Sequence, residues 1–96
     1  MIVHIALFKW KKDVEKNEVD KFLKDVGELK NVCPGLIDIM CGENFSKYSE
    51  GFTHAVVVFA KDRSSLQTYR EHPKHRIVAD KVNKMEEHGI GVDFEA

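Results

Sequence analysis

The stretch that decides the fold is the strongest strand signal in the chain, Thr53-His54-Ala55-Val56-Val57-Val58-Phe59-Ala60. β-Branched and aromatic side chains dominate it, and such residues favour extended backbone. Side chains alternate between the two faces of a strand, so Val56 and Val58 share one face with His54. The opposite face carries Ala55, Val57 and Phe59. This pattern predicts a strand that is covered on both sides.

The N-terminal part of the chain predicts a strand and a helix. Residues 2–8 are apolar on both alternating faces, which is typical of a central strand. Asn17 is the expected N-cap of the helix that follows. Apolar residues then recur at the spacing of three and four that marks one helix face, at Val19, Phe22, Leu23, Val26 and Leu29. Cys33-Pro34-Gly35 ends this helix, because proline lacks an amide hydrogen.

The elements after residue 35 are predicted from turn residues and caps. A strand over 36–41 and a polar loop over 46–51 precede the valine-rich strand. Asp62 or Ser64 caps the next helix, which Pro73 interrupts. Proline suits the first turn of a further helix, so Pro73 also begins a second helix. His88 is expected at the end of that helix, before a last strand over residues 90–94.

The order strand, helix, strand, strand, helix, strand predicts an α+β fold. It is the ferredoxin-like split βαββαβ protomer, with a four-stranded antiparallel sheet and helices on one face. Because the strands are apolar on both sides, the other face also needs a cover, and a second copy of the sheet is the simplest one. We therefore expect a homodimer that forms a dimeric α/β barrel. At this length we expect a single domain over residues 1–96.

Composition and charge argue against several classes of protein. The 15 basic and 16 acidic residues are interspersed and leave a net charge of -1, so we expect no nucleic acid partner. No apolar run approaches the roughly 20 residues that span a bilayer, and the first segment does not look like a signal peptide. We therefore expect no membrane partner and a cytoplasmic protein. Cys33 and Cys41 form no CxxC motif, and neither a phosphate-binding loop nor a metal motif occurs, so we expect no cofactor and no metal.

The groups that could carry chemistry cluster in Tyr69-Arg70-Glu71-His72-Pro73-Lys74-His75. On one straight helix Tyr69 and His75 would point about 240° apart. Pro73 disfavours helical geometry at the residue before it, so the second helix can begin at a new angle and return His75 toward Tyr69. Beneath an apolar pocket, a neutral His75 would accept a proton while the Tyr69 hydroxyl donates to an oxyanion. In the structural alternative, Tyr69 packs on the sheet and His75 caps a helix at the surface.

Two further histidines lie within the apolar strands. His4 and His54 could line the same pocket, bond to one another, or be satisfied by backbone carbonyls, which is the commonest outcome for buried imidazoles. Trp10 could form the rim of a pocket or anchor the end of the first strand. Beside the catalytic pair Tyr69 and His75, the predicted ligand-binding residues are His4, Ala6, Phe8, Phe22, His54 and Val56.

Several of these motifs occur together in a known family. The chain carries His4-Ile5-Ala6-Leu7-Phe8-Lys9, Pro34-Gly35, Gly51-Phe52-Thr53-His54-Ala55 and His72-Pro73-Lys74-His75. With these motifs it resembles the stress-responsive α/β barrel domain family (Dabb) over essentially its whole length. The resemblance implies a ferredoxin-like protomer that dimerises into a barrel.

The resemblance also implies a possible activity. A similar plant domain is a polyketide cyclase that performs an intramolecular aldol condensation. Its catalytic tyrosine and histidine match Tyr69 and His75, and its pocket positions match His4 and His54. Ala6 stands where a larger aliphatic residue is expected in the cyclase, which implies a differently shaped cavity.

Four functions remain open on the sequence. The first is a stress-response barrel protein that binds a small apolar or phenolic ligand without turnover. The second is a cofactor-free polyketide cyclase or lyase in which His75 is the base and Tyr69 the hydrogen-bond donor. The third is a monooxygenase, cofactorless or haem-linked, because such enzymes also use dimeric ferredoxin-like barrels. The fourth is a structural role in a larger assembly.

Overall fold

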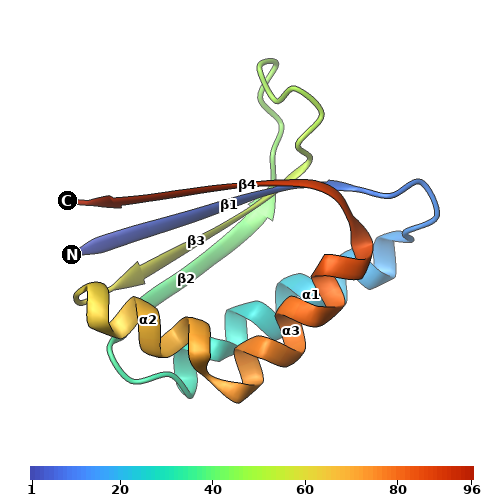
Figure 1. The fold of residues 1–96 in the computed structure, drawn as a ribbon. Helices are drawn as coiled ribbons and strands as arrows, with labels where there is room; N and C mark the ends of the chain where they lie inside the picture. Colours follow the sequence, from blue (N-terminus) through green and yellow to red (C-terminus); the bar gives the residue numbers. More distant parts are fainter.

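The structure is a computed structural model that describes residues 1–96. One antiparallel sheet, in the spatial order β2-β3-β1-β4, contains the strands β1 (Ile2–Trp10), β2 (Leu36–Glu43), β3 (His54–Ala60) and β4 (Glu86–Glu95). The helices cover one face of this sheet (Figure 1); they are α1 (Lys16–Glu28), the short 3₁₀ turn η1 (Leu29–Asn31), α2 (Arg63–Glu71) and α3 (Pro73–Met85). The predicted ferredoxin-like α+β fold is confirmed. None of the helices is both long and apolar enough to span a membrane.

The helix ends follow from local hydrogen bonding. The Asp62 carboxylate accepts a hydrogen bond from the Ser65 amide at 2.8 Å, which confirms Asp62 as the N-cap of α2. Pro73 begins α3, as predicted, and the His72 imidazole caps that helix by accepting from the Lys74 amide at 3.1 Å.

Two predictions about helix ends are wrong. The N-cap of α1 is Glu15 rather than Asn17, because the Glu18 carboxylate reaches back and accepts from the Glu15 amide at 3.0 Å. Asn17 lies within the first turn. His88 does not end a helix: α3 stops at Met85, and His88 pairs with Lys9 in the longer strand β4.

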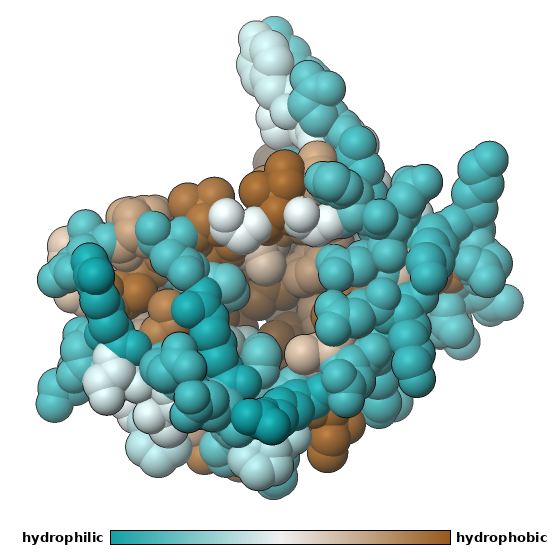
Figure 2. Space-filling model, viewed as in Figure 1, coloured by the Kyte–Doolittle hydropathy of each residue, from teal (hydrophilic) through white to brown (hydrophobic).

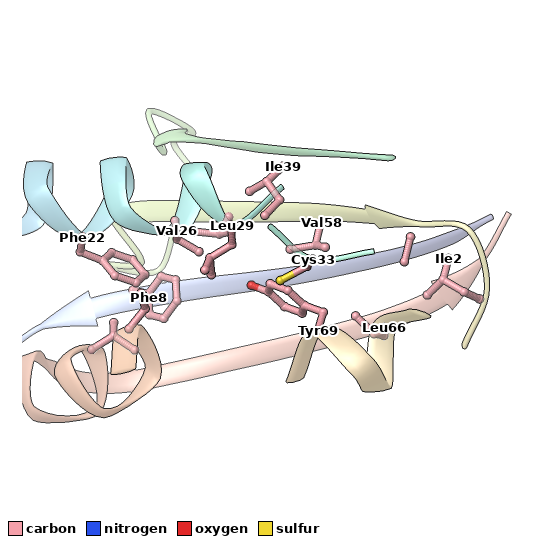
Figure 3. Close-up of a cluster of buried hydrophobic side chains, with 14 residues drawn as sticks. Ile2, Phe8, Phe22, Val26, Leu29, Cys33, Ile39, Val58, Leu66 and Tyr69 are labelled. Carbon is pink, nitrogen blue, oxygen red and sulfur yellow. The ribbon is translucent and has the colours of Figure 1, made fainter. Parts of the chain in front are cut away.

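The hydrophobic core lies between the sheet and the helices. Val58 and Ala60 of β3 are completely buried there, since they project from the face that the helices cover. Figure 3 shows the cluster, with side chains from α1 and α2 packed against the strands. The even-numbered positions of β1 and β3 face the helices, as alternation requires.

The opposite face of the sheet is apolar and uncovered in the single chain. Strand pairing places four apolar side chains in one row across the whole sheet, in the order Val92, Ile5, Val57 and Met40. The outer members are well exposed, with Val92 at 44% and Met40 at 58%. The loop between β2 and β3 projects from the sheet on the side away from the helices (Figure 1), and it exposes Phe45 and Tyr48.

Candidate active site

A small cavity of about 80 Å³ lies between the sheet and the helices. Figure 2 shows the surface hollowed between the sheet and the helices, with apolar side chains at its depth. Seven of the eight residues predicted for the site line this cavity, namely His4, Ala6, Phe8, Phe22, Val56, Tyr69 and His75. Helix α3 adds an apolar wall that the sequence reading did not include, formed by Val78, Ala79 and Val82.

Tyr69 and His75 converge because of the proline break. Tyr69 lies near the end of α2, and His75 lies in the first turn of α3. His72, between the two helices, has extended backbone with φ -63° and ψ 134°, as expected for a residue that precedes proline. The two ring centroids are 4.4 Å apart, with an angle of 55° between the ring planes. The new helix direction therefore removes the angular separation that one straight helix would impose.

His75 is held as a neutral imidazole with one free nitrogen. Its Nδ1 lies 3.1 Å from the carbonyl oxygen of Arg70. A carbonyl only accepts, so we assign the proton to Nδ1, and Nε2 keeps its lone pair. Burial lowers the pKa of His75; the hydrogen bond to the Arg70 carbonyl opposes this shift, and the positive charges of His4 and Arg70 lower the pKa further. This is the protonation state required of a general base.

Tyr69 is a buried phenol in the wall of the cavity. The residue is only 2% exposed, and Figure 3 shows its ring within the buried cluster beside Cys33. No fully buried side-chain oxygen lacks a partner, so the hydroxyl oxygen keeps some exposure, and we infer that it faces the cavity that Tyr69 lines. Burial raises the pKa of Tyr69 far above its ordinary value. The phenol therefore stays protonated and can donate.

A charged cluster that the sequence reading missed supports the cavity wall. The Asp93 carboxylate lies 2.5 Å from His4 Nδ1 and 2.5 Å from Arg70 Nη2. Partial burial alone would raise the pKa of Asp93, but hydrogen bonds from Arg70 and His4 lower it below its ordinary value. An ionised carboxylate only accepts, so His4 donates to it through Nδ1.

Arg70 and Asp93 connect the two histidines of the cavity. The Arg70 carbonyl orients His75, while its guanidinium binds the carboxylate that orients His4. Asp93 could not be found from local sequence, since only the pairing of β1 with β4 places it opposite His4. Alternation along the last strand could have shown one thing about Asp93. It puts this residue on the same face of β4 as Gly91 and Gly89.

His54 does not line the cavity, so it lies apart from the other seven residues predicted for the site. In the antiparallel register His4 pairs with Val58, whereas His54 pairs with Phe8, four residues further along β1 and about 13 Å away. The indole nitrogen of Trp10 donates to His54 Nδ1 at 2.9 Å. Trp10 itself stacks on Phe8, with ring centroids 5.2 Å apart. Both residues thus stabilise the far end of β1.

The protonation state of His75 predicts how stability changes with pH. Its pKa is lowered in the folded protein, so just below the ordinary value of 6.5 the unfolded chain binds more protons. The free energy of unfolding should therefore fall as the pH falls from 6.5 toward the folded-state pKa. Urea denaturation at a series of pH values should show a smaller acidic loss in His75→Asn than in the wild type. Parallel curves for the two proteins would contradict the assignment of His75 as a buried neutral base.

Comparisons with known proteins agree with this fold. The family described as "Stress responsive A/B Barrel Domain" matches residues 2–96. Olivetolic acid cyclase from Cannabis sativa is 28% identical over 76 residues, which cover 77% of this chain and 75% of the cyclase.

No grouping of three or more His, Cys, Asp or Glu side chains in the structure is suited to hold a metal ion.

Solved structures extend the comparison. A dimeric ferredoxin-like protein of unknown function from Thermobifida fusca has a TM-score of 0.88 at 25% identity, covering 99% of this chain and 90% of that chain. Hydroxynitrile lyase from Passiflora edulis has a TM-score of 0.89 at 18% identity, covering 97% and 90%. The similarity to the lyase shows the fold alone. Because the family match covers nearly all of the chain, this protein belongs to the stress-responsive A/B barrel domain family.

Proposed function

We propose that this protein binds a small carbonyl or phenolic compound in the cavity and catalyses proton transfer there without a cofactor. The observation that carries the proposal is the pairing of Tyr69 and His75, with ring centroids 4.4 Å apart, in a cavity whose other lining residues are apolar except for His4. A buried phenol that donates and a neutral imidazole that accepts are the two groups that enolate chemistry requires. The distant relationship to olivetolic acid cyclase supports the same class of reaction.

The proposed reaction forms or breaks a carbon–carbon bond beside a carbonyl group. His75 Nε2 removes a proton from the carbon next to the carbonyl, and the Tyr69 hydroxyl donates a hydrogen bond to the enolate oxygen. The enolate carbon then attacks a second carbonyl carbon, and the resulting alkoxide takes back the proton from the His75 imidazolium. The reverse sequence cleaves the same bond. No electron acceptor is needed, because the steps move only protons and electron pairs within the reactants.

The size of the cavity limits what it holds. Pockets for drug-sized ligands measure about 300–1,000 Å³, whereas this cavity measures about 80 Å³. It therefore accommodates the reacting end of a ligand, a carbonyl group with a few carbon atoms. The rest of a larger ligand has to lie outside.

We also propose that the protein works as a homodimer closed by the apolar sheet face. The row from Val92 to Met40 spans all four strands and lies uncovered in the single chain. Exposed apolar patches of this kind mark interaction sites. The dimeric ferredoxin-like relative from Thermobifida fusca supports a second copy as the partner. Phe45 and Tyr48, exposed on the loop that projects on that side, extend the proposed contact.

Proton transfer is tested with pentane-2,4-dione, a small compound with acidic carbon-bound protons. We expect the wild-type protein to speed the exchange of these protons for deuterium in D₂O, followed by NMR. We also expect a higher melting temperature, because a ligand at about 100 times its Kd stabilises the folded state by about 2.7 kcal/mol. Stabilisation without exchange would leave a binding protein that performs no turnover. If small ketones, aldehydes and phenols produce neither effect, the proposed function is wrong.

A further inference from the structure

We propose that Gly91 forms the entrance to the cavity, and that its missing side chain determines which ligands enter. The chemical class of those ligands, small carbonyl and phenolic compounds, rests on the proposed function. The entrance itself follows from strand register, backbone conformation and the free space beside Ala6.

The register places Gly91 beside the cavity. Gly91 pairs with Ala6, and directly paired residues in an antiparallel sheet project on the same face. Ala6 lines the cavity, so a side chain at position 91 would project on the cavity side of β4. A Cβ atom built there meets no atom within 4 Å. β4 is the edge strand, and Figure 2 shows the hollow directly beneath it.

The backbone gives no reason for glycine at position 91. Among the glycines, only Gly35 and Gly51 have positive φ angles, so the backbone at position 91 does not require glycine. Glycine inside a strand is destabilising, and it often marks a place where a ligand approaches closely. Gly89, two residues earlier, is different, because a Cβ atom there would lie 2.6 Å from the Glu86 carboxylate. Of these two glycines, only Gly91 has open space where a side chain would project.

A polar residue on the cavity wall supports the entry of a ligand. Tyr69 lines the cavity, and the residue as a whole is only 2% exposed. On the α1, α3 and β3 sides the cavity is lined by apolar side chains such as Phe22, Val78 and Val56. Because the cavity holds only a few atoms, the remainder of a ligand has to lie outside it. The hollow beneath β4 and the missing side chain at Gly91 make this edge the route that we infer.

Chemical modification tests the entrance without any assumption about the natural ligand. Diethyl pyrocarbonate acylates neutral imidazoles, and mass spectrometry of peptides gives the rate at each histidine. In Gly91→Leu we expect the modification of His75 to slow severalfold relative to that of the exposed His88. Gly42→Leu is the matched control, since Gly42 also lies in an edge strand with no atom within 4 Å of a built Cβ. It pairs with Ala55, on the other face of the sheet, so the His75 rate should not change in a variant that light scattering shows to keep the wild-type oligomeric state.

The outcomes separate the entrance from the proposed chemistry. An unchanged His75 rate in folded Gly91→Leu, with folding checked by circular dichroism, would overturn the entrance. If Gly91→Leu does not fold, Gly91→Ala takes its place and should slow the modification of His75 to a smaller extent. An unchanged His75 rate in Gly91→Ala would also overturn the entrance. Slower modification together with lost exchange of pentane-2,4-dione in Gly91→Leu supports both proposals. Slower modification, with no exchange even in the wild type, supports the entrance and counts against the chemistry.

Discussion

Tyr69→Phe and His75→Asn should each slow the deuterium exchange of pentane-2,4-dione by about 10²- to 10⁴-fold, the usual contribution of a positioned acid or base. His75→Asn removes the free Nε2 that takes the proton. Tyr69→Phe removes only the hydroxyl and keeps the buried ring, so packing should be preserved. The two changes act on the same step, and the double variant should lose little more than either single variant.

Matched controls exist for both substitutions. Tyr48→Phe removes the same hydroxyl at a 77% exposed position on the loop between β2 and β3. His72→Asn changes the histidine beside Pro73 and retains a residue that caps helices well. Neither control should alter the exchange rate. Activity that survives in Tyr69→Phe and His75→Asn, with folding intact, would show that the pair is structural.

The wild-type rate should also depend on pH in a defined direction. His75 acts as a base only when it is neutral, and burial lowers its pKa below the ordinary 6.5. Exchange should therefore persist at pH values where free imidazole is already largely protonated. It should be lost only as the pH falls through the lowered pKa. Loss of activity well above pH 6.5 would assign the titration to another group.

Val92→Asp should convert the dimer to a monomer. Val92 is 44% exposed in the single chain, so an acid there costs the isolated protomer little. In a two-fold symmetric dimer the substitution places two unpaired carboxylates in an apolar interface, and each costs several kcal/mol in effective desolvation. The dimer should therefore dissociate at concentrations where the wild type remains paired, as measured by light scattering after size-exclusion chromatography.

Ile77→Asp is the control for the interface. Ile77 is similarly exposed, at 57%, but it lies on α3 on the other side of the sheet. It should leave the dimer intact. A wild-type monomer, or a Val92→Asp protein that still forms dimers, would show that the apolar sheet face is not the interface between copies.

Much of the fold could be predicted because its signals are local. The alternation in residues 53–60 and the apolar spacing in α1 each lie within one element, so neighbouring residues contain the whole pattern. Pro73 acts on the residue next to it, and this made the break between α2 and α3 predictable. The N-cap of α1 was misplaced because several polar residues precede the helix, and a contact between Glu18 and the Glu15 amide decides among them.

The candidate site was less predictable where it depends on strand register. The sequence left open whether His4 and His54 line the same pocket, because alternation within each strand does not say which face of the sheet either histidine takes. Their separation along the sheet follows from how β1 and β3 pair, which no local pattern contains. The same limit hid Asp93, because it meets His4 only when β4 pairs with β1, 89 residues apart in the chain.

Local patterns in the sequence predicted the type and order of the elements, the two apolar faces of the sheet and the proline break between Tyr69 and His75. These depend on residue types over short distances, where propensity, alternation and the missing amide of proline act directly. Only the tertiary structure decided which histidine joins the cavity, which carboxylate orients it and where Gly91 leaves a gap. Those are consequences of long-range strand pairing, in which a shift by one residue would send each side chain to the other face.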